Sequence, residues 1–159
     1  MKVAVTQMTS GGAIRDNLSV AVQLIARAAS AGVKAVFLPE ATDFIAPPDV
    51  APALTRSADN RAFVEGVCEA AKTNAVWVSV GIHEVPEKDE KRCYNTQLLI
   101  DQGGAIRARY RKLHLYDVDI HQGPSILESN TTIPGDSLTA PIETPVGRMG
   151  VRRLFSQSS

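Results

Sequence analysis

Short apolar segments alternate with longer amphipathic ones in the first half of the chain, and this alternation constrains the fold more than any other feature. Val3-Ala4-Val5, residues 35–38 and residues 76–82 are apolar and short enough to be strands. Two stretches of helical length separate them. Strands that alternate with helices form βαβ units, so the sequence predicts an α/β fold.

The two intervening stretches carry the end signals of helices. Asp16 or Asn17 can cap the first helix, and Gly32 can end it. Ser57 can cap the second, which is predicted to run to about Lys72. We therefore expect two helices on one face of a mixed sheet.

After residue 82 the predicted strands follow one another directly. Residues 86–92 form a charged turn that is too short for a crossover helix. Asp101-Gln102-Gly103-Gly104 then separates two strand candidates, and its glycines favour a hairpin turn. Residues 113–141 are rich in proline and are expected to form a long ordered loop, followed by a second hairpin around residues 145–148.

Composition narrows the class of partner. Lys plus Arg and Asp plus Glu both number 17, so no net charge attracts nucleic acid or an anionic membrane, and a small-molecule partner is expected. No apolar run approaches the roughly 18 residues of a membrane span. Met1 leads directly into the first strand without a leader segment, so we expect a cytoplasmic protein.

The cysteines and histidines do not form a recognisable metal or redox motif. Cys68 and Cys93 lack the spacing of a zinc site or a redox pair and are expected to be reduced structural thiols. His83, His114 and His121 are dispersed, so no metal site is predicted. His114 is expected to pack or to form a loop hydrogen bond.

Three charged residues stand at ends of apolar segments or in the predicted loop. Glu40 follows Pro39 after a buried strand, so its carboxylate is expected to be partly desolvated, as suits a general base. Lys112 leaves the end of the predicted hairpin, and Glu128 lies in the long loop. Each residue alone is better explained as a solvated or hydrogen-bonded surface group. Their interpretation depends on joint context.

That context comes from segments whose order and spacing resemble those of the nitrilase superfamily of C-N hydrolases. These segments are residues 3–8 (VAVTQM), 37–41 (FLPEA), 94–96 (YNT), 110–115 (YRKLHL) and 144–150 (TPVGRMG). Residues 43–46 (DFIA), 117–120 (DVDI), 122–124 (QGP) and 128–135 (ESNTTIPG) are similar to the Nit branch, which includes the deaminated glutathione amidases. The resemblance covers residues 1–151, roughly the N-terminal half of a family member.

The resemblance implies a fold, a set of roles and a substrate class. The fold is part of an αββα sandwich. Glu40 corresponds to the general base, Lys112 to the lysine that stabilises the tetrahedral intermediate, and Glu128 to the glutamate that orients this lysine. The implied substrate is a small carboxylate-bearing amide such as deaminated glutathione, and no metal or organic cofactor is implied.

The chain departs from the family after Val151. The family continues to its cysteine nucleophile, whereas residues 152–159 form a Ser-rich tail with Leu154 in the cysteine's ungapped position. Leucine cannot form an acyl-enzyme. We therefore expect residues 1–151 to be an incomplete C-N hydrolase domain that is inactive alone. The alternatives are a catalytically silent homologue that binds ligand or pairs with a full-length subunit, and a nonfunctional truncated product.

An incomplete sandwich also predicts an uncovered sheet face. We expect this face near Val36, Val78, Leu98 and Ile106 or their immediate neighbours, because alternate strand residues point to opposite faces. Exposed apolar surface of that kind favours a homo-oligomer or another partner.

Overall fold

A five-stranded mixed sheet forms the centre of the computed structural model, which describes residues 1–119 and 125–151. The strands lie in chain order: β1 (Val3–Val5), β2 (Ala35–Phe37), β3 (Trp77–Glu84), β4 (Tyr94–Ile100) and β5 (Ile106–Arg111). The first three are parallel, and β3, β4 and β5 pair antiparallel. The predicted α/β fold with a mixed sheet is therefore confirmed.

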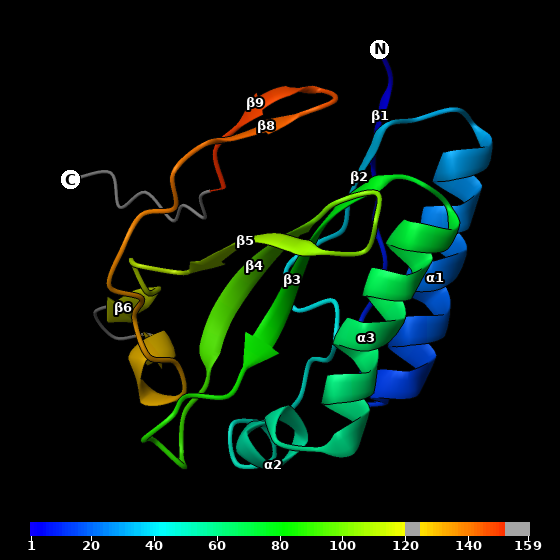
Figure 1. Ribbon diagram of the computed structural model, residues 1–159. Coiled ribbons are helices and arrows are strands. Elements are labelled where there is room, and N and C mark those ends of the chain that lie inside the picture. Colours follow the sequence, from blue (N-terminus) through cyan, green and yellow to red (C-terminus); the bar gives the residue numbers. More distant parts are fainter. Residues whose placement is uncertain (120–124, 152–159) are drawn as a thin grey trace.

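Two long helices, α1 (Ile14–Ser30) and α3 (Ala58–Thr73), lie side by side against one face of this sheet (Figure 1). Ser57 caps α3 as predicted, because its Oγ accepts a hydrogen bond from the Asn60 amide at 3.1 Å. Gly32 follows the end of α1 with a φ of 77°. A short helix, α2 (Ala51–Thr55), was not predicted, because five residues are too few to show a helical period.

The predicted side-chain cap of α1 is wrong. Ala13 occupies the N-cap position and makes no side-chain cap. Asn17 is instead buried, and its amide donates to the carbonyls of Gly11 and Asp43, each at 2.8 Å. This side chain ties the start of α1 to the segment that follows β2.

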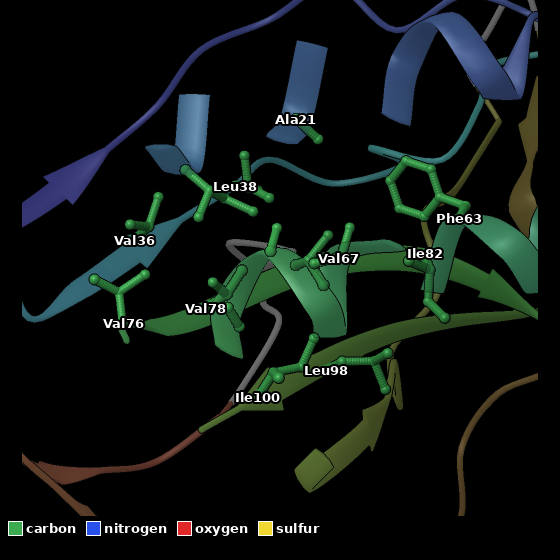
Figure 2. Close-up of a cluster of buried hydrophobic side chains, with 14 of the residues drawn as sticks. Ala21, Val36, Leu38, Phe63, Val67, Val76, Val78, Ile82, Leu98 and Ile100 are labelled. Atoms are coloured by element: carbon green, nitrogen blue, oxygen red, sulfur yellow. The ribbon is translucent and has the colours of Figure 1, made fainter. Parts of the chain in front are cut away.

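The main core lies between the helices and the sheet, as Figure 2 shows. Val36, Val78 and Leu98 point into this core, so the prediction that they mark the uncovered face is wrong for these residues themselves. Alternation correctly groups them on one face but does not tell which face the helices cover. Ile106 is 38% exposed.

The immediate neighbours of those residues form the second face, and much of it is covered. Its buried residues are Ala35, Trp77, Leu99, Ala108, Tyr110 and Val151. The hairpin of β8 (Ile142–Thr144) and β9 (Gly147–Met149) packs here through Ile142, Val146 and Met149. At the sheet edge, Val3 and Val5 of β1 remain 50% and 83% exposed.

The segment predicted as one long loop contains further structure. Strands β6 (Asp117–Asp119) and β7 (Ser125–Leu127) pair antiparallel, and a 3₁₀ turn spans Glu128–Asn130. Strands of three residues are too short to show alternation in sequence. No helix in the described ranges has the length and apolar character needed to cross a bilayer.

Candidate active site

The segment after β2 carries Glu40 beside the central strand β3. Gly81 of β3 donates to the Pro39 carbonyl at 3.2 Å, and the Thr42 amide donates to the Gly81 carbonyl at 2.9 Å. Glu40 is thus held at the carboxyl end of a parallel strand pair, where α/β proteins commonly place functional groups. Its side chain is exposed, so the expected partial desolvation is not found.

Lys112 directly follows β5 and is only 3% exposed. Its Nζ donates to Glu128 Oε2 at 2.6 Å. Its backbone is held on both sides, because the Lys112 amide donates to the Asn95 carbonyl and the Gly135 amide donates to the Lys112 carbonyl, each at 2.8 Å. A buried ammonium requires such pairing, since an unpaired charge away from water is costly.

Glu128 begins the 3₁₀ turn and pairs with Lys112. Its Oε2 also accepts from the Tyr116 amide at 2.6 Å, and the Glu128 amide donates to the Tyr116 carbonyl at 3.1 Å. Next along the turn, the Ser129 amide donates to Asp117 Oδ1 at 2.9 Å, and this bond lowers the pKa of Asp117. The β6 segment thereby fixes the turn that presents Glu128.

Asn95 of β4 connects the two glutamates. Its Nδ2 donates to Glu40 Oε1 and, at 3.3 Å, to Glu128 Oε1. A continuous series of polar contacts therefore runs from Glu40 through Asn95 and Glu128 to Lys112. Each member comes from a different segment of the chain.

The three predicted residues line one pocket of about 610 Å³. Its lining is Glu40, Pro48, Lys112, Tyr116, Ser125, Leu127, Glu128, Asn130 and Thr131. The pocket offers a buried positive group that can stabilise an oxyanion and an exposed carboxylate that can accept a proton. Glu40, Lys112 and Glu128 are therefore brought together, and their catalytic roles stay predictions.

Both cysteines occupy sites that disfavour the thiolate. Burial raises the pKa of Cys93 to about 11, and the nearby Asp43 carboxylate adds to this effect. Burial also raises the pKa of Cys68 on α3, with a smaller contribution from Glu65. Both thiols are therefore protonated at neutral pH.

The histidines have different environments. His83 Nδ1 lies 3.0 Å from Oδ1 of the fully buried Asp43, and the His83 amide donates to Asp43 Oδ2 at 2.7 Å. His114, expected to pack or to bond within the loop, is exposed. His121 and Leu154 lie outside the described residues. Across the described ranges, no group of three or more His, Cys, Asp or Glu side chains is placed to hold a metal ion.

Sequence reasoning missed two contributors to the site. Asn95 belongs to the Tyr94-Asn95-Thr96 segment, which marked it as similar to the family but gave no sign that its amide bridges both glutamates. Tyr116 contributes its backbone amide, and any residue other than proline supplies that donor. The side-chain pattern therefore could not reveal it.

Comparisons with known proteins show which family the chain is similar to. The carbon-nitrogen hydrolase family model matches residues 2–152. A probable hydrolase, nit2, of Schizosaccharomyces pombe is 42% identical over 154 residues, covering 96% of this chain and 55% of that protein. Human deaminated glutathione amidase is 40% identical, covering 94% of this chain and 46% of the relative.

A solved structure shares the fold. The crystal structure of the C. elegans NitFhit protein aligns with a TM-score of 0.87 and 35% identity, over 94% of this chain and 37% of that one. The chain spans about half the length of the curated relatives it matches, from 34% to 55% for the first three. On the family match, the relatives and the fold, the chain belongs to the carbon-nitrogen hydrolase family of the nitrilase superfamily.

Proposed function

We propose that the chain carries the base and lysine half of an amidase site for small carboxylate-bearing amides such as deaminated glutathione. The observation that carries this proposal is the buried Lys112–Glu128 pair, with 2.6 Å between Nζ and Oε2, in one pocket with Glu40. The likeness to human deaminated glutathione amidase supports the substrate class.

The chemistry of amide hydrolysis assigns a role to each group. When a thiolate adds to the amide carbon, negative charge develops on the carbonyl oxygen, and the Lys112 ammonium is the group that would stabilise it. Glu40 would take the proton of the thiol and give it to the departing nitrogen, so that ammonia leaves and a thioester remains. Glu40 would then deprotonate the water that hydrolyses the thioester.

The sequence has no cysteine at the position where the family has its nucleophile. Leu154 stands in the cysteine's ungapped position, and the thiols of Cys68 and Cys93 are held protonated. We therefore propose that the 159-residue chain binds amides without turning them over.

Pairing with a second subunit, such as a full-length homologue, is the second candidate function. The observation that favours pairing is the edge strand β1, where Val3 and Val5 are 50% and 83% exposed. An exposed edge with apolar side chains is a common site of association.

Amide binding can be tested by NMR titration of the ¹⁵N-labelled chain with the ω-amide of a small dicarboxylic acid. The wild type should show saturable shifts at the amides of Tyr116 and Gly135, which contact Glu128 and Lys112. Lys112→Met should abolish them. Lys72→Met, which removes a 64%-exposed lysine of α3, is the matched control and should bind as the wild type does.

Two outcomes would overturn the proposal. One is a folded wild-type chain that shows no saturable shift. The other is a Lys112→Met variant, folded by its own spectrum, that binds as tightly as Lys72→Met. Glu128→Gln provides a second variant if Lys112→Met does not fold.

A further inference from the structure

Asn95 places one side-chain amide between two carboxylates that come from distant parts of the chain. Glu40 lies 55 residues before it and Glu128 lies 33 residues after it. An amide group has two hydrogens, so one Nδ2 can donate to both oxygens at once. Carboxylates that would otherwise repel one another are thereby joined through a neutral donor.

The backbone around Asn95 is held by strand pairing and by a hydrogen bond to Lys112. Asn95 pairs with His83 across β3 and β4, and His83 is anchored by the buried Asp43 carboxylate through its ring nitrogen and its amide. The Asn95 carbonyl also accepts from the Lys112 amide at 2.8 Å. Asn95, near the start of β4, therefore contacts Glu40, Glu128 and the backbone of Lys112.

We infer that Asn95 is a positioning residue that holds Glu40 and Glu128 in one arrangement and so couples the base to the carboxylate that orients Lys112. The assignment of these groups as base and lysine partner rests on the proposed function. Glu40 is exposed, and a long exposed side chain loses considerable rotamer freedom when it is held in one geometry. The hydrogen bond from a strand-anchored amide supplies that restraint.

The coupling can be measured without substrate, so its outcome is independent of amide binding. In the ¹⁵N-labelled chain, the Asn95 side-chain amide resonance should shift as acid neutralises its two acceptors. Glu40→Gln should remove part of this shift, and Glu128→Gln should remove another part. Gln97 is the control resonance, because its Nε2 donates to Ser79 Oγ at 2.9 Å on the same strand.

Asn95→Leu and Gln97→Leu assign the two resonances by their disappearance. Two results would overturn the inference. One is an Asn95 resonance that shifts with acid no more than the Gln97 resonance does. The other is an Asn95 shift in both Glu40→Gln and Glu128→Gln that equals the shift in the wild type.

A second variant distinguishes the positioning role of Asn95 from a purely structural one. Asn95→Asp keeps the shape of the side chain but replaces the donor with a third carboxylate, so it should lower stability at neutral pH and regain stability on acidification. Gln97→Glu, the matched control, should lack this pH profile. Equal pH profiles in the two variants would contradict the placement of Asn95 between the glutamates.

Discussion

Lys112 and Glu128 illustrate at the residue scale how a charge is kept inside a protein. The lysine is 3% exposed and the glutamate side chain 17% exposed, so water screens their interaction poorly. Removal of one partner leaves an unpaired buried charge, which is costly even where the intact pair adds little stability. The pair by itself is therefore weak evidence for a gain in folding stability.

The first prediction concerns this pair. Lys112→Met should lower the free energy of unfolding by about 3 kcal/mol, because it leaves Glu128 partly buried without its cation. Urea unfolding at pH 7 measures the change. Adding Glu128→Gln should restore part of the loss, whereas Lys72→Met should change stability by no more than about 0.5 kcal/mol. Equal effects of Lys112→Met and Lys72→Met would contradict the burial argument.

The second prediction follows from the pKa of Cys93, which burial raises from 9.0 to about 11. The unfolded chain loses the thiol proton at lower pH than the folded chain. The protonated Cys93 thiol therefore contributes fully to the free energy of unfolding below about pH 9. This contribution, about 2 kcal/mol, is lost as the pH rises to about 11. Unfolding free energies of wild type and Cys93→Ala across this range provide the measurement. Parallel pH profiles would show that Cys93 ionises normally.

At the scale of elements, the sequence predicted one helix cap and one turn that depend on neighbouring residues. The helix cap at Ser57 and the turn at Asp101–Gly104 were found where the residue types required them. The contacts of Asn17 and Asn95 were not, because their partners lie in other segments. Alternation in β3 grouped Val78 with its face but could not say which face the helices cover.

The site shows the same division. Motif resemblance brought Glu40, Lys112 and Glu128 together before the structure did, and the structure places them in one pocket. Exposure of Glu40 could not be predicted, since it depends on how the surrounding segments pack around the pocket.

The third prediction tests how the loop after β5 supports Lys112. A methyl group added at Gly135 would collide with the Arg111 carbonyl oxygen and lie 2.8 Å from Arg111 Cβ. Gly135→Ala should therefore cost about 2 kcal/mol and weaken the bond from the Gly135 amide to Lys112. Gly150→Ala is the control, because nothing lies within 4 Å of its added Cβ. Thermal unfolding that ranks the two variants equally would argue against this close approach.

At the scale of the whole molecule, two layers cover the sheet unequally. Helices α1 and α3 cover one face (Figure 1). On the other face, Val151 and the β8–β9 hairpin pack in the second cluster. Trp77, the single tryptophan of the chain, is 8% exposed in this second cluster. Its fluorescence therefore reports whether the hairpin is docked.

The fourth prediction uses that reporter. Val151→Asp should place a charge in the second cluster, release the hairpin and shift Trp77 emission to longer wavelength, while far-UV circular dichroism keeps its helical signal. Leu138→Asp, at a 66%-exposed position, should leave the emission unchanged. An unchanged spectrum in Val151→Asp would mean that the hairpin does not protect Trp77.

Ammonia release from deaminated glutathione and from small ω-amides tests the central claim most directly. The chain contains Glu40, Lys112 and Glu128 but has Leu154 in the register of the nucleophile, so neither the wild type nor the Cys68→Ala/Cys93→Ala variant should release ammonia above the buffer blank. The NMR titration with an ω-amide shows in parallel that the pocket is formed. Turnover that depends on Cys68 or Cys93 would contradict the proposed inactivity. Turnover that survives the loss of both cysteines would contradict the cysteine, glutamate and lysine chemistry itself.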